Sequence, residues 1–90
     1  MDGINFNSMM PRFKRMVAQY VNENPDKGYG VQLSSDDVYI VWFCKTLQNV
    51  KALLSTPISD GMYYEITYNG DKNEFYFDAY KKVVNILIKG

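Results

Sequence analysis

The chain contains no histidine among its 90 residues. Histidine is the side chain most often used for proton transfer near neutral pH, and it is a common ligand of transition metals. Its absence excludes Ser-His and Cys-His nucleophile pairs and removes most transition-metal sites. An enzyme built on this chain would need an active site made only of Asp, Glu, Lys, Tyr and Cys, so we expect no enzymatic activity and no cofactor.

Cysteine and long apolar runs are also scarce. Cys44 is the only cysteine, so no disulfide can form within the chain, and a reducing compartment fits best. Because Cys44 lies in an apolar run, we interpret it as a small core residue and not as a nucleophile. No stretch approaches the about eighteen apolar residues that span a membrane, and Met1-Asp2-Gly3 does not resemble a secretion signal. We therefore expect a cytoplasmic protein with no membrane partner.

An excess of either charge is missing. Ten Lys plus Arg balance ten Asp plus Glu, and the two signs are interspersed. This balance predicts no long-range attraction to nucleic acid or anionic lipid, and it argues against a strongly acidic DNA mimic. The low repulsion between copies favours self-association.

Hydrophobic residues, in contrast, are plentiful. They make up 47% of the chain and aromatic residues 16%, which is ample for one compact core. The length of 90 residues indicates a single small globular domain over residues 1–90. No internal repeat, linker or low-complexity segment divides it.

An amphipathic helix is predicted over Ser8 to Asn24. Asn7 or Ser8 can cap it, and Asn24-Pro25 ends it before the loop Gly28-Tyr29-Gly30. Its apolar side chains recur at helical spacing: Phe13, Met16, Val17, Tyr20 and Val21.

The spacing of apolar residues in 38–56 does not decide between a helix and a hairpin. Ser34-Ser35-Asp36-Asp37 looks like a capping box, which favours a helix. Val38 to Phe43 is a run of β-branched and aromatic residues, which favours strands, and we prefer the strands. A three-residue loop, with Asn49 in the left-handed region, would then join them. This register pairs Trp42 with Leu54, Cys44 with Ala52 and, unfavourably, Lys45 with Lys51.

A second hairpin is predicted from Met62 to Tyr80, after a turn at Asp60-Gly61. Its arms alternate at period 2, which is typical of half-buried strands. The inward side chains are Met62, Tyr64, Ile66, Phe75, Phe77 and Ala79. A four-residue loop, Asn69-Gly70-Asp71-Lys72, sets Ile66 against Phe75, Tyr64 against Phe77 and Met62 against Ala79. Val83 to Ile88 continues as a bent strand or a short final element.

Two surfaces are candidates for binding. The outward face of the hairpin carries tyrosines and acids, and large rigid side chains are typical of protein interfaces. Its candidate interaction residues are Tyr63, Glu65, Tyr76, Asp78 and Tyr80. The alternative is that these tyrosines cover a second layer of the same fold, such as Lys45, Lys51 or the N-terminal helix.

The second surface is the basic side of the helix. Arg12, Lys14 and Arg15, supported by Lys81 and Lys82, could contact phosphates, which gives nucleic-acid binding as the alternative function. Three cations on an amphipathic helix are more often a solvated face.

No other motif carries chemistry. We interpret Asp36 and Asp37 as residues at an element boundary and not as a catalytic or metal-binding pair. The run from Asn69 to Glu74 lacks the spacing of a calcium loop and is interpreted as a turn, and no glycine pattern fits a phosphate-binding loop.

Two strings, VWFCKTLQN at residues 41–49 and YYEITYNGDK at residues 63–72, are distinctive. With their surroundings, from about Asp36 to Lys82, they resemble a family of short uncharacterised proteins encoded by phages and prophages of Gram-positive bacteria. The resemblance implies a phage origin and a role in the cytoplasm of the infected host cell. It implies no activity and no site residues.

Together these features predict an α+β domain in which the N-terminal amphipathic helix packs on an antiparallel meander of three to five strands. The expected core is Phe13, Met16, Val17, Tyr20, Val41 or Trp42, Leu54, Tyr64, Ile66, Phe75 and Phe77. The leading functional hypothesis is a small non-enzymatic phage accessory protein that binds a host protein, or itself, and modulates host or defence functions.

Overall fold

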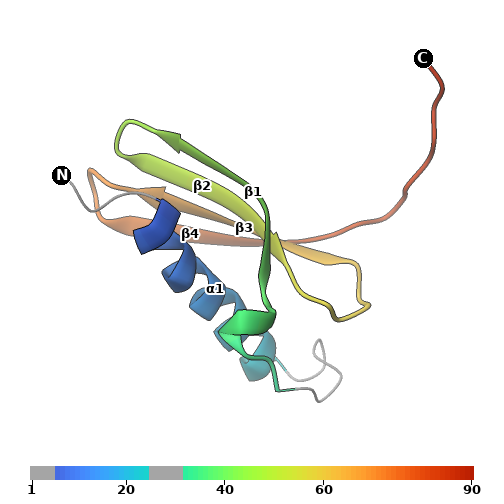
Figure 1. The fold of residues 1–90 in the computed structure, drawn as a ribbon, viewed down its shortest axis with the longest axis horizontal. Helices are drawn as coiled ribbons and strands as arrows, with labels where there is room; N and C mark the ends of the chain where they lie inside the picture. Colours follow the sequence, from blue (N-terminus) through green and yellow to red (C-terminus); the bar gives the residue numbers. More distant parts are fainter. Residues whose placement is uncertain (1–5, 25–31) are drawn as a thin grey trace.

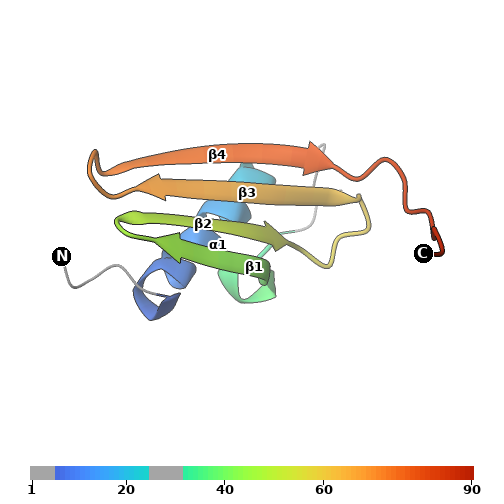
Figure 2. The ribbon, with the colours of Figure 1, turned by 90° about the horizontal axis from the view of Figure 1, so that it is seen from above.

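The computed structural model describes residues 6–24 and 32–90. Its elements are α1 (Phe6–Glu23), the 3-10 turn η1 (Ser35–Asp37), and the strands β1 (Tyr39–Thr46), β2 (Asn49–Ser55), β3 (Met62–Asn69) and β4 (Glu74–Lys81). The four strands form one antiparallel sheet in the order β1-β2-β3-β4, and α1 lies across one of its faces (Figure 1, Figure 2). We call this the inner face and the opposite one the outer face. The predicted α+β fold is confirmed.

Helix α1 covers the inner face with an apolar stripe, as its periodicity predicts. Its buried side chains are Met9, Met10, Phe13, Val17, Ala18 and Val21. The helix begins at Phe6, so Asn7 and Ser8 lie in its first turn, and their predicted role as the residue before the helix is wrong. At the other end, Asn24 donates from its side chain to the carbonyl of Tyr20 at 2.7 Å. The predicted stop at Pro25 and the Gly28-Tyr29-Gly30 loop lie outside the described residues.

The Ser34 capping box exists, but it caps only the short turn η1. Ser34 Oγ accepts from the backbone of Asp36 at 3.2 Å, and Asp37 accepts from the Ser34 backbone at 3.0 Å. The chain then enters β1 at Tyr39, because the following β-branched and aromatic residues favour an extended backbone. The preference for strands over a helix in residues 38–56 is confirmed.

The predicted register of the first hairpin is wrong by one residue. The turn has two residues, Leu47 and Gln48, with Leu47 at a φ of 56°, and Asn49 already belongs to β2. Lys45 therefore lies opposite Val50 and no longer opposite Lys51, which removes the like-charge pair that counted against the predicted register.

A β-bulge in β1 also changes which side chains face the core. The pairing passes from Ile40 opposite Leu54 to Trp42 opposite Leu53, so that Val41 is the extra residue. The one-residue register shift turns Phe43 toward the core and Trp42 away from it, and the bulge turns Val41 outward, so that Val41 and Trp42 are 44% and 41% exposed. The predicted burial of Val41 or Trp42 is wrong, and so is that of Cys44, which is exposed opposite Lys51.

In the second hairpin the predicted faces are confirmed, but the register is shifted by two residues. The loop has four residues, Gly70 to Asn73, and so begins one residue later than predicted, with Asn73 at a φ of 52°. Ile66 therefore lies opposite Phe77, Tyr64 opposite Ala79 and Met62 opposite Lys81. This register adds a pair in which the rings of Tyr68 and Phe75 lie 4.7 Å apart.

The core lies between α1 and the inner face. The rings of Phe13 and Phe75 form a T-shaped pair with centroids 6.1 Å apart, and the ring centroids of Tyr20 and Phe77 are 5.1 Å apart. The fully buried side chains include Phe13, Val17, Val50, Leu54, Tyr64 and Ile66. Apart from Val41 and Trp42, every predicted core residue is buried or packs against this cluster. Sequence reasoning missed Met10, Ala18, Leu33, Val38, Val50 and Tyr68.

After Lys81 the chain forms no further element, so the predicted strand or final element at Val83 to Ile88 is wrong. This segment, which we call the tail, extends away from the sheet (Figure 1, Figure 2). Its apolar side chains are exposed: Val83, Val84, Ile86, Leu87 and Ile88. Among the helices of residues 6–24 and 32–90, none has the length and apolar character needed to cross a membrane.

Candidate functional site

The candidate interaction residues meet on the outer face of β3 and β4. Tyr63 lies opposite Tyr80, and Glu65 opposite Asp78 in the next outward pair. Tyr76 follows, opposite Thr67. The alternation of the two strands thus brings all five predicted residues onto one surface, where the tyrosines of β4 are the most open, with Tyr76 52% and Tyr80 53% exposed.

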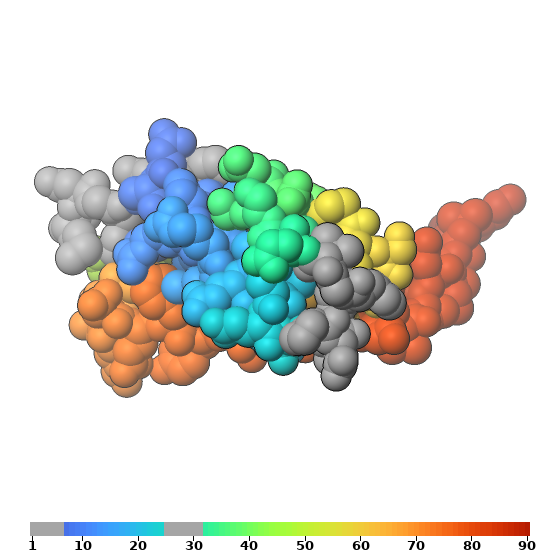
Figure 3. Space-filling model, turned by 90° about the horizontal axis from the view of Figure 1, so that it is seen from below, coloured from blue at the N-terminus to red at the C-terminus, as the bar shows by residue number. Residues whose placement is uncertain are grey.

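No element of the described chain covers this surface. Helix α1, the strongest alternative occupant, packs on the inner face instead, as the view from that side shows (Figure 3). Lys51 does lie beside the surface, with its Nζ 4.0 Å from Glu65, but it is a neighbour within the same sheet and not a second layer. Within residues 6–24 and 32–90, the tyrosines therefore do not serve to hold a second layer of the fold.

An open groove extends the surface toward β1. Its volume is about 350 Å³, and it is lined by Trp42, Leu53, Tyr63, Glu65, Tyr80, Lys81 and Lys82. Sequence reasoning missed Trp42 and Leu53, because the predicted register placed Trp42 in the core. The unfavourable pairing of Lys45 with Lys51 in the predicted register was the signal that could have found Trp42. A shift of one residue separates the two lysines, and the same shift moves Trp42 to the outer face of the sheet.

The charges on the outer face are partly unbalanced. Glu65 and Asp78 are directly opposite each other, and like charges in that position are destabilising. Lys51 approaches only Glu65. Tyr76 donates its hydroxyl to Glu74 at 3.1 Å, and this hydrogen bond, together with the charge of Glu74, raises the pKa of Tyr76. The surface thus combines aromatic rings with an acidic pair that has room for a basic group.

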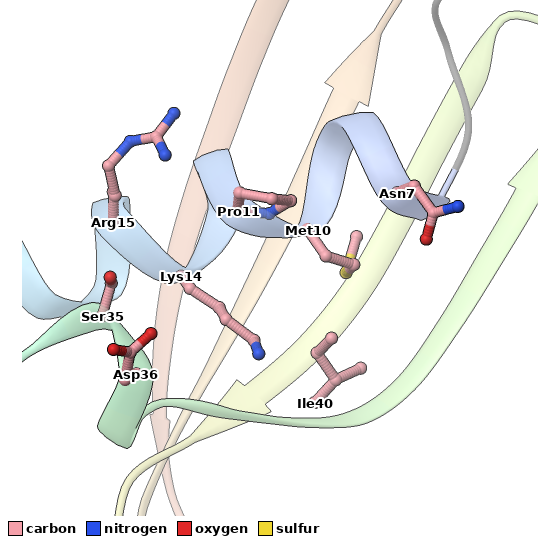
Figure 4. A pocket seen from close by; sticks show the side chains of 8 residues that line it. All are labelled: Asn7, Met10, Pro11, Lys14, Arg15, Ser35, Asp36 and Ile40. Atoms are coloured by element: carbon pink, nitrogen blue, oxygen red, sulfur yellow. The ribbon is translucent and has the colours of Figure 1, made fainter.

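The helix cations do not form one surface. Arg12 places its guanidinium 5.0 Å from the centre of the Phe75 ring, on the β4 side of α1. Lys14 and Arg15 are among the residues that line a pocket of about 290 Å³ between α1 and η1, with Asp36 and Ile40. In that pocket their side chains point in different directions (Figure 4). Lys81 and Lys82 lie at the outer groove, so the five predicted phosphate contacts are spread over three places.

The acidic motifs lie in local turns. Asp37 completes the Ser34 capping box. Asn69 accepts hydrogen bonds from the backbone of Asp71 at 3.1 Å and of Lys72 at 3.3 Å, which confirms the turn. No group of three or more metal-binding side chains occurs in the described part of the chain.

A family model described as a family of unknown function (DUF6275) matches residues 11–90. No curated protein matches the chain significantly, and neither does any solved structure.

Proposed function

We propose that this chain, which belongs to that family of unknown function, is a small non-enzymatic accessory protein that binds another protein through the outer face of its sheet. The observation that supports this most is the grouping of Tyr63, Tyr76 and Tyr80 on a face that no described element covers. Tyrosine gives a large contact area at a low cost in side-chain entropy, and it is enriched in protein interfaces.

The partner should carry a basic side chain at the centre of the contact. Glu65 and Asp78 repel each other across the strands, and a Lys or Arg placed between them would relieve this repulsion. The same acids would repel phosphates, so this face favours a protein partner over nucleic acid.

A bacterial host protein is the partner class that we propose. The resemblance of the VWFCKTLQN and YYEITYNGDK strings to phage and prophage proteins supports a phage origin and a place of action in the cytoplasm of the infected cell. Modulation of a host or defence function would suit a small domain that acts through one binding face.

The experiment is affinity capture of proteins from infected bacterial cells, followed by mass spectrometry. Tyr76→Ala should lose the captured partner, because the ring supplies contact area, whereas Tyr76→Phe should keep most of it. Both variants should retain the unfolding midpoint of the wild type, since Tyr76 lies outside the core.

A charge-reversal pair tests the acidic centre. Asp78→Lys should weaken capture strongly, because it opposes the basic group of the partner. Asp71→Lys is the matched control, since this acid is also exposed but lies in the β3–β4 loop. A set of captured proteins that stays the same in Tyr76→Ala and Asp78→Lys would rule out the outer face as the binding site.

A further inference from the structure

Two apolar surfaces of this chain lack a partner in the described structure. One is the tail, in which Val83 is 93% and Leu87 84% exposed. The other is the outer groove beside Trp42, Leu53 and Tyr80. Monomeric proteins rarely leave such surfaces open to water, and contiguous ones commonly mark interaction sites.

The tail has the pattern of a strand with one fully apolar side. In an extended chain, Val84, Ile86 and Ile88 point to the same side, and all three are β-branched. The other side carries Asn85 between Val83 and Leu87, and Lys89 after them. The uninterrupted side is therefore the one suited to pack against an apolar surface.

The groove of the same copy is a poor site for this tail. Lys82, which immediately precedes the tail, itself lines the groove. Its backbone donates to Gly61 at 2.8 Å, which keeps the chain on its course beyond β4. A return over the same face would need a reversal at Val83 and Val84, and β-branched residues are disfavoured in tight turns.

A second copy removes this difficulty. Because each tail starts at the rim of a groove, a two-fold axis near Lys82 would direct each tail to the groove of the other copy. Six extended residues span about 20 Å, and a sheet of four strands is about 14 Å across, so the reach is sufficient. The formal net charge of zero leaves little repulsion between two copies.

We propose that two copies exchange their tails, so that Val84, Ile86 and Ile88 of each copy pack into the groove at Trp42 of the other. The inference extends the proposed function, since it assigns a second copy of this chain to a groove on the same outer face. Tyr63, Glu65 and Tyr80 line this groove and would be covered by the tail, whereas Tyr76 and Asp78 lie outside it and stay accessible to a host protein.

Trp42 is the only tryptophan and reports directly on the groove. Its fluorescence emission should shift to the blue as the protein concentration rises, in parallel with a change from monomer to dimer in sedimentation equilibrium. Ile86→Ser should abolish both changes. Leu87→Ser is the matched control, since it removes a similar side chain from the other side of the tail, and it should preserve them.

Three results would overturn the exchange. A wild-type chain that stays monomeric, a dimer without any shift of Trp42, or equal effects of Ile86→Ser and Leu87→Ser would each do so. A blue shift that is independent of concentration would show instead that the tail occupies its own groove. Capture of the host protein is measured separately, with Tyr76→Ala. If the tails are not exchanged but capture is intact, only the exchange is contradicted. If the tails are exchanged but Tyr76→Ala does not reduce capture, only the proposed function is contradicted.

Discussion

The side chain of Asn22 and the backbone of Leu33 are joined by two hydrogen bonds. Asn22 Nδ2 donates to the Leu33 carbonyl at 2.8 Å, and Asn22 Oδ1 accepts from the Leu33 N–H at 2.7 Å. This pair connects the last turn of α1 to the segment that leads into η1. It therefore fixes where the chain returns to the sheet and helps to place Leu33 in the core.

Asn22→Ala should destabilise the domain by about 2 kcal/mol, because it removes two partly buried hydrogen bonds and leaves two backbone groups without a partner. Urea denaturation measures this change. Gln19→Ala is the control, since the hydrogen bond from the Gln19 side chain to Glu23 at 3.0 Å is exposed, and the substitution should cost less than about 0.5 kcal/mol. Equal losses in the two variants would contradict a structural role for Asn22.

Two core tyrosines should respond differently to loss of the hydroxyl. Tyr64 Oη is buried with no hydrogen-bond partner among the described residues, whereas Tyr68 donates to Asn73 at 2.9 Å. Tyr64→Phe should leave the free energy of unfolding unchanged or raise it, and Tyr68→Phe should lower it by about 1 kcal/mol. Denaturant titration of the two variants gives the comparison, and a larger loss in Tyr64→Phe would reverse this ranking.

Alkaline stability should depend on Tyr64. Burial, with smaller effects of Asp60 and Tyr20, raises the pKa of Tyr64 from 10.0 to about 12. Between these pH values the unfolded phenol ionises while the folded one stays neutral, so the folded state binds more protons and stability falls as the pH rises. Unfolding titrations from pH 9 upward should show a shallower fall for Tyr64→Phe than for the wild type. Parallel curves would exclude this contribution.

The two hairpin turns at one end of the sheet contact each other. Gly70 donates its N–H to the carbonyl of Gln48 at 2.9 Å, and a Cβ on Gly70 would collide with that same oxygen. Gly70→Ala should therefore destabilise the domain by about 1–3 kcal/mol, measured by thermal or urea unfolding. Gly90→Ala, where a Cβ meets nothing within 4 Å, should have no effect. A neutral Gly70→Ala would show that the turns can move apart.

Periodic patterns predicted most of this fold. The spacing of Phe13, Val17 and Val21 identified α1 and its buried side, because one face of a helix repeats every 3.6 residues. The alternation in β3 and β4 identified both faces of the hairpin and so grouped the candidate residues correctly, since even the two-residue register error preserves the faces.

These local patterns did not predict the register of the strands or which segments pair with each other. The β1–β2 register depends on Leu47 at a positive φ and on the bulge at Val41, which the residue types alone do not indicate. Because a shift of one residue exchanges the two faces of a strand, that single error placed Trp42 and Cys44 in the core. The tail was missed for a related reason, since its β-branched pattern predicts a strand but does not say whether a neighbouring strand is available.

The bulge at Val41 also bears on how this protein avoids aggregation. Strand β1 is the outermost strand on its side of the sheet, and a regular outermost strand can act as a template on which further chains add without limit. An extra residue interrupts the regular ladder of hydrogen bonds and increases the local twist of the strand. Both effects oppose the addition of a further strand. The bulge at Val41 therefore protects the β1 edge of the sheet against pairing with the edge of a further chain.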